Sequence, residues 1–349
     1  MKYIKVKGED AENARRIMLR LSLADNSRTI LHSRSYVYFP IADIRGAKAI
    51  KLIDRLGNIV EKGKPEKHRN TAYAEKLKKI IKNTKGRLSK GYDLLGDIAI
   101  IEFSGNKSDA EKIAKLLMQS NKSIKTVLAK EGAVSGKYRT RKFRYIAGIK
   151  NYVANYRENG CIFKFDVRKV FFSNRLSFER SRILKLVEDN EKVMVMFAGA
   201  GPFAIEIAKH RKNSNITAIE LNRDGYKYML DNIKLNKVNN VHAVLGDVKK
   251  VYKKYTGQDR IIMPLPMSST EFLSEAYKVG RSGSYVHLYA LVDLDTGTEK
   301  LHEAIKLQAK KSGYRVDIMN SRIVRPYSAK QAEIVVDFRI EPLSRNRRI

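Results

Sequence analysis

The stretch Val193-Met-Val-Met-Phe-Ala-Gly-Ala-Gly-Pro-Phe-Ala-Ile205 decides the fold that this sequence predicts. It opens with apolar residues suited to a short buried strand, and a turn of small residues with Gly199 and Gly201 follows. Pro202 suits the first position of a helix, because that position needs no backbone N–H. Strand, glycine turn and helix together form the first unit of a nucleotide-binding βαβ fold, in which the helix N-terminus adds positive potential.

Acidic and proline residues follow the next strands along the chain. Residues Asn215–Glu220 predict a second strand that ends in a carboxylate about 20 residues after the glycines, where a Rossmann-type site places its ribose-binding acid. A third predicted strand ends at Asp247, and a fourth ends in Pro264-Leu-Pro266. Because the carboxyl ends of parallel strands meet at one edge of a sheet, we expect a ligand to bind there.

Two cofactors suit such an edge, NAD and S-adenosylmethionine. Phe203 stands where the dinucleotide pattern G-x-G-x-x-G has its third glycine, which counts against NAD. Asp247 favours S-adenosylmethionine, since its carboxylate can accept a hydrogen bond from the adenine amino group. For the glycines alone, a tight connection between strand and helix is the alternative interpretation.

The composition favours a nucleic-acid partner. The 349 residues include 70 Lys+Arg against 37 Asp+Glu, and the resulting net charge of +33 indicates a polyanion as partner, with a generally basic proteome as the alternative. The sequence has no long apolar span or signal peptide, so we expect a cytoplasmic protein that does not bind membranes. The single cysteine, Cys161, excludes an intrachain disulfide and a cysteine zinc site.

Changes of pattern along the chain predict an α/β protein with three domains. Residues 1–62 predict a small α/β domain, and the charged stretch 63–72, which contains Pro, predicts a basic linker. Residues 73–168 predict a middle α/β domain. Residues 169–349 predict a Rossmann-like domain with a doubly wound sheet of six or seven strands.

Local patterns predict further elements in these domains. Arg157-Glu-Asn-Gly160 predicts a β-hairpin with an Asn-Gly turn. Lys169-Val-Phe-Phe-Ser173 predicts one more strand, and residues 72–83 predict a helix. The runs Tyr314–Met319 and Glu333–Arg339 predict a terminal strand pair.

With these elements in place, the sequence resembles the archaeal and eukaryotic tRNA (guanine-37-N1) methyltransferases. The resemblance rests on these runs, which stand in the family's order: Arg157-Glu-Asn-Gly160, Phe165-Asp166, Val170-Phe-Phe-Ser-Asn-Arg-Leu176, Glu179-Arg180, Met196-Phe-Ala-Gly-Ala-Gly-Pro-Phe203, Glu220-Leu-Asn222, Asn232-Ile-Lys-Leu-Asn236 and Asp259-Arg-Ile-Ile-Met263. It implies a Rossmann-like, S-adenosylmethionine-dependent methyltransferase sheet preceded by two smaller α/β domains, the first of which contacts tRNA.

Two departures from the family pattern affect the expected site. Val195 stands near the end of the first strand, where family members carry an acid, so cofactor binding depends more on Glu220 and Asp247. Pro264 stands where the family's Asn-Pro-Pro or Asn-Leu-Pro loop has an asparagine that touches the target base. Proline there resembles the archaeal subgroup that also methylates C7 of a tricyclic wyosine intermediate (imG2), which implies this second activity.

The resemblance also implies roles for four charged residues. Glu179 matches the family's general base, which removes the N1 proton of guanine, and such help is worth about 10²–10⁴-fold. Arg139 matches the arginine that faces O6, where a guanidinium stabilises developing negative charge. Arg175 and Arg180 flank Glu179 and are expected to orient its carboxylate, the cofactor or a phosphate. The alternative is an exposed acid in the first turn of a helix for Glu179, a simple phosphate contact for Arg139, and a solvated helix face for Arg175 and Arg180.

The expected cofactor site includes acids for the ribose and the adenine together with small and apolar residues around them. Its members are Arg180, Phe197, Gly199, Gly201, Glu220, Leu221, Asp247, Val248 and Pro264. The flipped target base is expected to contact Arg139 and the loop Pro264, Leu265 and Pro266. No metal is expected.

The expected partner is tRNA, bound through its anticodon loop and body by a monomeric protein. Two other functions stay open: an RNA methyltransferase of another specificity, and a basic RNA-binding protein without catalysis, for which Val195 is the only support. His287 and Tyr289 lie on the predicted fifth strand, and we interpret both as core residues.

Overall fold

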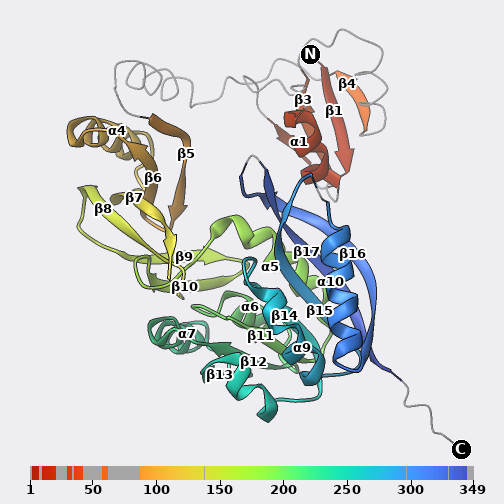
Figure 1. Cartoon of the computed structure of the whole chain (residues 1–349). Coiled ribbons are helices and arrows are strands. Elements are labelled where there is room, and N and C mark those ends of the chain that lie inside the picture. The colour runs from red at the N-terminus through yellow and green to blue at the C-terminus, as the bar shows by residue number, and fades with distance from the viewer. Residues whose placement is uncertain are drawn as a thin grey trace, which may run out of the picture. The chain divides into compact units, whose positions relative to one another are not determined.

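The structure is a computed structural model, and Figure 1 shows its helices and strands. It describes residues 2–7, 10–20, 30–33, 35–41, 57–61, 87–136, 138–295, 297–328 and 330–343. Contacts divide the chain into two compact units, Met1–Thr84 and Lys85–Ile349. The predicted linker at 63–72 and the predicted helix at 72–83 lie outside the described residues, and the domain boundaries stay predictions.

The first unit contains a four-stranded sheet in the order β2-β3-β1-β4. Its elements are β1 (Lys2–Lys7), α1 (Ala11–Arg20), β2 (Leu31–His32), β3 (Tyr36–Pro40) and β4 (Asn58–Glu61). Ile4 and Val6 lie on one face of β1, because alternate strand residues share a face, and they pack with Met18 of α1 and with Phe39.

The second unit begins with a four-stranded sheet in the order β5-β6-β7-β8. Its elements are β5 (Arg87–Leu95), β6 (Ile98–Ser104), α4 (Lys107–Ser120), β7 (Thr126–Ser135) and β8 (Thr140–Gly148). Strands β6 and β7 are parallel, and α4 makes the crossover between them. The Asn106 side chain caps α4 by accepting a hydrogen bond from the Asp109 backbone N–H at 2.8 Å.

A two-stranded hairpin follows, formed by β9 (Val153–Glu158) and β10 (Cys161–Asp166). Asn159 and Gly160 have φ angles of 45° and 75°, as a tight Asn-Gly turn requires, so this prediction is confirmed. The free edge of β10 is covered by two side-chain amides, since Asn232 and Asn236 accept from the backbone N–H groups of Lys164 and Ile162 at 2.7 and 2.8 Å.

The predicted strand at Lys169–Ser173 is wrong, because these residues form a turn and an extended segment without strand pairing. The backbone N–H groups of Lys169 and Val170 both donate to the Asp166 carbonyl at 3.0 Å, which reverses the chain. Phe172 then stacks on Phe165 with the ring centroids 4.4 Å apart. The aromatic run that suggested a strand therefore packs onto the hairpin instead.

The largest sheet has seven strands in the order β13-β12-β11-β14-β15-β17-β16. Its strands are β11 (Lys192–Met196), β12 (Asn215–Glu220), β13 (Val241–Leu245), β14 (Gln258–Met263), β15 (Gly280–Asp293), β16 (Tyr314–Pro326) and β17 (Gln331–Pro342). The first five are parallel, and β17 runs antiparallel between β15 and β16. The predicted terminal strand pair and the Rossmann-like α/β class are confirmed.

Helices cover both faces of this sheet (Figure 1). They are α5 (Ser177–Leu186), α6 (Pro202–His210), α7 (Arg223–Asn236), α8 (Val248–Val251), α9 (Leu273–Val279) and α10 (Glu299–Lys311). Val193 and Val195 of β11 pack in the core formed with α5, α6 and α7. Met194 and Met196 pack in the core formed with α8, α9 and α10. The continuous apolar run of β11 thus reflects burial on both faces.

Gly201 makes the turn between β11 and α6, as the sequence predicts. Its φ angle is 88°, and it precedes α6 as the N-terminal cap, with Pro202 at the first helical position. A Cβ atom at Gly201 would lie 2.9 Å from side-chain atoms of both Ile205 and Met229. Glycine is therefore required here for backbone conformation and for packing.

Candidate active site

A cavity of about 410 Å³ lies at the carboxyl ends of the parallel strands. It brings together nine residues that the sequence assigns to the cofactor or the target base: Arg139, Phe197, Gly199, Glu220, Leu221, Asp247, Val248, Pro264 and Leu265. These residues come from the loops after β11, β12, β13 and β14 and from the start of β8. Four strand ends and one neighbouring sheet therefore build a single binding cavity.

Glu220 is held rigidly at the floor of this cavity. Its two carboxylate oxygens accept from the backbone N–H groups of Gly199 and Asn222, each at 2.6 Å. Burial raises the pKa of Glu220, and the hydrogen bonds from Asn222 and Gly199 oppose that shift. A Cβ atom on Gly225 would approach the Glu220 side chain to 3.2 Å, so Gly225 leaves room for this carboxylate.

Asp247 and the apolar residues complete the cavity wall. The Asp247 side chain accepts from the Lys249 backbone N–H at 3.0 Å and so caps α8. Phe197, which has a positive φ of 60°, packs edge-on against Phe272 with centroids 4.7 Å apart. The cavity thus combines a flat apolar wall with two carboxylates from neighbouring strand ends.

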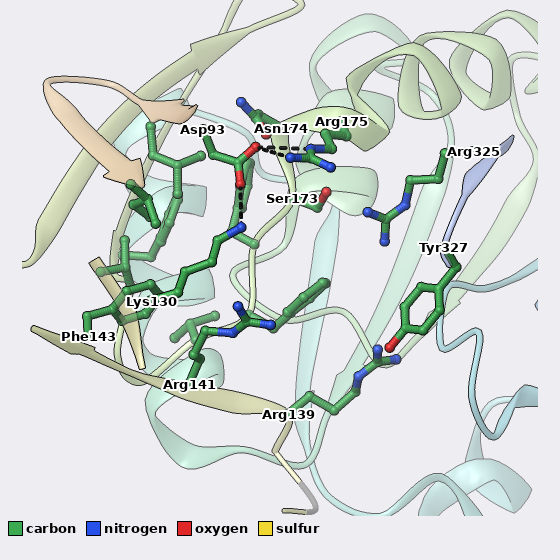
Figure 2. A pocket seen from close by; sticks show the side chains of 17 residues that line it. Asp93, Lys130, Arg139, Arg141, Phe143, Ser173, Asn174, Arg175, Arg325 and Tyr327 are labelled. Atoms are coloured by element: carbon green, nitrogen blue, oxygen red, sulfur yellow. Dashed lines mark hydrogen bonds and ion pairs between the residues drawn. The ribbon is translucent and has the colours of Figure 1, made fainter. Parts of the chain in front are cut away.

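A second cavity, of about 180 Å³, adjoins the first and shares Arg139, Val170 and Phe171 with it. Its cationic lining residues are Lys130, Arg139, Arg141, Arg175 and Arg325. Figure 2 shows these side chains converging from the β5–β8 sheet, from the segment before α5 and from β16. The second cavity is therefore strongly positive.

Asp93 is the acidic member of the second cavity. Lys130 and Arg175 pair with its carboxylate at 3.0 and 2.8 Å. Although burial raises the pKa of Asp93, these two cations hold it below its ordinary value. Arg175 is thus brought to the second cavity, where it binds Asp93 and does not contact Glu179.

Arg139 stands on the wall between the two cavities. Its guanidinium lies 5.3 Å from the centroid of the Phe171 ring, and its Nε is buried with no partner among the described residues. Burial lowers the pKa of Arg139, while Tyr327 and Glu333 oppose the shift. A half-buried guanidinium with an unpaired N–H is suited to bind a carbonyl oxygen of a ligand.

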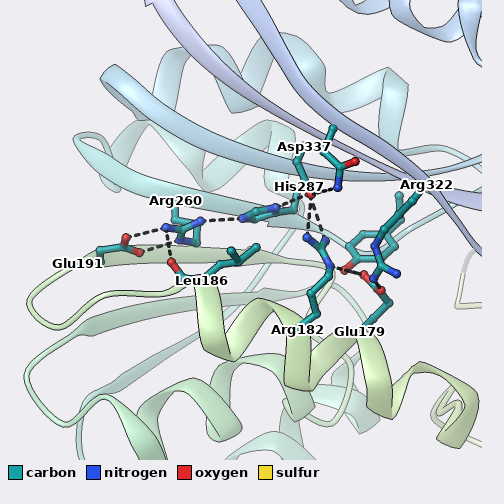
Figure 3. Close-up of polar contacts among 10 residues, drawn as sticks. Glu179, Arg182, Leu186, Glu191, Arg260, His287, Arg322 and Asp337 are labelled. Atoms are coloured by element: carbon teal, nitrogen blue, oxygen red, sulfur yellow. Dashed lines mark hydrogen bonds and ion pairs between the residues drawn. The ribbon is translucent and has the colours of Figure 1, made fainter. Parts of the chain in front are cut away.

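Glu179 lines neither cavity and is almost fully buried, with 1% of its surface exposed. Its Oε2 accepts from Arg182 and from the Tyr289 hydroxyl, each at 3.0 Å, and its Oε1 pairs with Arg322 of β16 (Figure 3). The carboxylate thus lies on α5, buried between two arginines and a tyrosine hydroxyl.

Arg180 also lies outside the cavities, in a separate buried cluster. It pairs with Glu158 of the hairpin and lies 3.3 Å from Glu206 of α6, and it donates to the Ser173 carbonyl at 3.0 Å. Burial and the neighbouring Glu158 raise the pKa of Glu206 to about 9. Gly201 and Pro266 likewise do not line the cavities, and the role predicted for each of these residues stays a prediction.

Several residues that line the two cavities were not predicted as site residues from the sequence. Asp93 and Lys130 belong to a different sheet from the glycine turn, and Phe272 lies in a short helical turn beyond the proline loop. Asn222 belongs to the run Glu220-Leu-Asn222, and an asparagine directly before a helical pattern predicts an N-terminal cap, which it forms for α7. The importance of Gly225 depends on a contact with Glu220 that has no local signature.

Two other kinds of chemistry receive no support from the described residues. No group of three or more His, Cys, Asp or Glu side chains among them is placed to hold a metal ion. Burial raises the pKa of Cys161 to about 12, so this thiol is not a thiolate nucleophile at neutral pH.

No helix in the described ranges is long and apolar enough to cross a membrane.

Three protein-family profiles match successive parts of the chain. The tRNA methyltransferase 5 N-terminal domain matches residues 4–49, and the TYW2 N-terminal domain matches residues 73–151. The TRM5/TYW2 methyltransferase domain matches residues 154–317, which include the ends of β11, β12, β13 and β14 at the larger cavity.

Similar curated proteins differ in how much of the chain they cover. The tRNA (guanine(37)-N(1))-methyltransferase Trm5b of Pyrococcus abyssi is 33% identical and covers 97% of this chain and 98% of its own length. The tRNA (guanine(37)-N(1))/4-demethylwyosine(37)-methyltransferase Taw22 of Nanoarchaeum equitans is 32% identical over 63% of this chain and 90% of its own. The tRNA(Phe) (4-demethylwyosine(37)-C(7)) aminocarboxypropyltransferase of Methanocaldococcus jannaschii is 31% identical over 72% and 98%.

Solved structures agree with these relatives. Trm5b from Pyrococcus abyssi has a TM-score of 0.70 at 32% identity and covers 98% of this chain and 99% of its own. A complex of aTrm5 with tRNALeu has a TM-score of 0.68 at 28% identity, with 97% and 99% covered. TYW2 of M. jannaschii in complex with AdoMet has a TM-score of 0.57 at 28% identity, with 72% and 100% covered. On these matches along nearly its whole length, the chain belongs to the TRM5/TYW2 methyltransferase family.

Proposed function

We propose that this protein transfers a methyl group from S-adenosylmethionine to N1 of guanosine 37 in tRNA. The observation that carries the proposal is the pair of adjoining cavities with Arg139 on their common wall. One cavity offers two carboxylates and an apolar wall for an adenosine group, and the other is strongly positive, as an RNA strand requires. A basic chain of net charge +33 fits the same partner.

The larger cavity suits S-adenosylmethionine in size and in chemistry. Both Glu220 oxygens accept backbone hydrogen bonds, and because a carboxylate has about four acceptor sites it can also accept from a ribose hydroxyl. Asp247 can accept from the adenine amino group, while Phe197 and Val248 supply apolar contacts. Gly225 leaves the space that Glu220 needs. S-adenosylmethionine supplies an electrophilic methyl group when it is bound there.

The chain's own residues then act on the flipped guanine. Arg139 donates a hydrogen bond to O6 and stabilises the negative charge that develops as N1 loses its proton. Glu179 accepts that proton as the general base. For this step Arg322 must turn away from Glu179 Oε1, and the side chain of Arg322 is partly exposed, so it can move toward an RNA phosphate.

We propose methylation of C7 of the wyosine precursor at position 37 as a second activity. Pro264 lines the larger cavity at the position where the family resemblance implies an asparagine, so this chain has no side-chain amide there to select guanine. The bifunctional Taw22 of N. equitans, at 32% identity, supports the proposal. Without that amide, binding of a larger tricyclic base leaves no buried polar group of the pocket without a hydrogen-bond partner.

Aminocarboxypropyl transfer is the alternative within the family, because it uses the same cofactor for a different group. The relative with that name covers 98% of its own length but only 72% of this chain, whereas the Trm5b of P. abyssi covers 97%. This chain also contains the N-terminal domain that the tRNA methyltransferase 5 profile matches. The domain content therefore favours methyl transfer.

The test uses S-adenosylmethionine labelled either in the methyl group or in the amino-acid chain, with unmodified tRNA carrying guanosine 37. We expect methyl label alone to appear in N1-methylguanosine, identified by mass, and the wyosine-precursor tRNA to gain a methyl group at C7. Label from the amino-acid chain in the product would instead establish aminocarboxypropyl transfer. Absence of both products with these tRNAs would reject the proposal.

The base is tested with Glu179→Gln in the same assay. We expect the rate of N1-methylguanosine formation to fall about 10²–10⁴-fold while S-adenosylmethionine still binds, because general-base help is lost and the cofactor cavity is untouched. An unchanged rate would remove Glu179 from this role.

We also propose that the protein is cytoplasmic and monomeric. Light scattering of the purified protein measures its mass in solution, and the mass of a dimer would contradict the monomer.

A further inference from the structure

Helix α5 rests on the seven-stranded sheet through a buried polar seam rather than through apolar contacts alone. The seam runs across three strands, β14, β15 and β17, as a chain of hydrogen bonds and ion pairs (Figure 3). Its members, in spatial order, are Glu191, Arg260, His287, Asp337, Arg182 and Glu179, with Tyr289 beside the last. The seam therefore ends on the proposed base.

The hydrogen-bond pattern fixes the state of His287 at the centre of this seam. Arg260 can only donate, so His287 Nε2, at 2.9 Å from it, accepts. The proton is then on Nδ1, which donates to Asp337 at 2.6 Å. Burial lowers the pKa of His287, and this agrees with a neutral ring. Asp337 is in turn bound by Arg182 at 2.7 and 3.1 Å, so every member has a defined direction.

A buried charged seam of this kind is costly to fold. Replacing buried ion pairs by apolar side chains of similar volume is often neutral or stabilising, because desolvation of the charges offsets their attraction. The connected hydrogen bonds nevertheless give each of these side chains one orientation. We therefore expect the seam to contribute to the orientation of Glu179 rather than to the stability of the fold.

Two donors fix the same oxygen of Glu179. Arg182 Nε and the Tyr289 hydroxyl both donate to Oε2 at 3.0 Å, from the helix and from β15 respectively. Oε1 is left to face Arg322, whose side chain is 22% exposed against 1% for Glu179. One oxygen is therefore held from the buried side, and the other is the oxygen that can exchange partners.

We propose that Tyr289, Arg182 and Asp337 are positioning residues that hold Glu179 by Oε2 so that Oε1 receives the N1 proton. This rests on the proposed function, in which Glu179 is the base. His287 acts at one remove, because its Nδ1–H orients the Asp337 carboxylate that binds Arg182.

Tyr289→Phe tests the proposal with little disturbance, since it removes one hydroxyl and leaves no charge unpaired. The matched control is Tyr277→Phe: Tyr277 is also fully buried, and its hydroxyl donates to the Ile305 carbonyl at 3.0 Å on the opposite face of the sheet. For Tyr289→Phe we expect kcat to fall about 10–100-fold, as misplacement of a reacting group does, with KM for tRNA and for S-adenosylmethionine unchanged.

Tyr277→Phe should keep the wild-type kcat while losing a similar amount of thermal stability. Asp337→Asn, which removes the charge that holds Arg182, should lower kcat without changing cofactor affinity measured by calorimetry. Equal kcat values for Tyr289→Phe and Tyr277→Phe would overturn the positioning role, as would a kcat loss matched by a rise in KM.

The proposed function fails separately in the same series of measurements. If wild type forms N1-methylguanosine and Glu179→Gln is slow, but Tyr289→Phe is as fast as wild type, only the positioning inference is wrong. If Glu179→Gln is as fast as wild type, the base assignment is wrong and the inference fails with it.

Discussion

Two neighbouring residues of α5 enter two very different buried ionic clusters. Glu179 faces the sheet. There acidic and basic side chains alternate along a chain of hydrogen bonds that leads from Glu179 to Arg182 and on to Asp337. Arg180 points to the hairpin and α6, where one guanidinium serves two carboxylates, Glu158 and Glu206. Successive helix residues lie about 100° apart, so one turn of helix can supply both clusters.

The difference shows that the ratio of charges decides protonation when burial is similar. In the alternating cluster, burial alone would raise the pKa of Asp337, but His287 and Arg182 hold it well below its ordinary range. In the other cluster, burial and the neighbouring Glu158 outweigh the opposing charge of Arg180, and they raise the pKa of Glu206 to about 9. The cations of the first cluster lower the pKa of Asp337, whereas Glu206 in the second cluster holds a proton at neutral pH.

The largest effect on stability is expected for Arg180→Gln. The substitution leaves Glu158 and Glu206 buried without a cation, and breaking a buried pair in this way costs about 3–5 kcal/mol. Arg182→Gln should cost less, about 1–3 kcal/mol, because Tyr289, Arg322 and His287 still bind the carboxylates of Glu179 and Asp337. Chemical unfolding of both variants beside wild type measures the free energies.

In one cluster two acids share Arg180, and in the other acids and bases alternate around Arg182. If Arg182→Gln loses more stability than Arg180→Gln, the difference that we expect between these two clusters is wrong. A protein with Arg180→Gln that shows no cooperative unfolding transition agrees with the larger cost. Its Arg182→Gln counterpart must still unfold cooperatively for the comparison to stand.

A smaller, pH-dependent effect is expected for Glu206→Gln. The pKa of Glu206 rises from 4.5 to about 9 in the folded protein, so the folded state binds this proton more tightly than the unfolded state. The contribution of this group to stability is complete below pH 4.5 and is lost as the pH rises to about 9. Glu206→Gln imitates the protonated form and should gain on the order of 1–3 kcal/mol relative to wild type across that window.

Melting temperatures of the two proteins between pH 5 and about pH 9 measure this difference. We expect the wild-type curve to fall more steeply with rising pH than the Glu206→Gln curve. Parallel curves would show that Arg180 balances both carboxylates and that no proton is held.

The smallest effect is expected for an exposed pair, which shows what burial adds. Lys107 and Glu111 lie 3.9 Å apart on α4, with 80% and 41% of their side chains exposed. Lys107→Ala should change the free energy of unfolding by less than about 0.5 kcal/mol, because water screens such pairs. A loss comparable to that of Arg182→Gln would mean that burial does not set the scale of these interactions.

The sequence alone determined the strand, glycine turn and helix around Gly201 and the acids after the next two strands. These features depend on apolar patterns, on the steric freedom of glycine and on the rule that parallel strands end at one edge. These rules predict that Glu220 and Asp247 lie at one edge of the sheet, and both line the larger cavity. The strand predicted at Lys169–Ser173 failed because its aromatic residues pack on the hairpin.

Only the tertiary structure decided which charges meet. Tyr289 and His287 are buried, as interpreted, but their polar atoms bind Glu179 and Asp337. Tyr289 lies 110 residues from Glu179 along the chain, and no local pattern specifies such a partner. The second cavity likewise joins segments from three parts of the chain. Periodicity is a property of neighbours in sequence, whereas the pairing and protonation of buried charges depend on what the fold places opposite them.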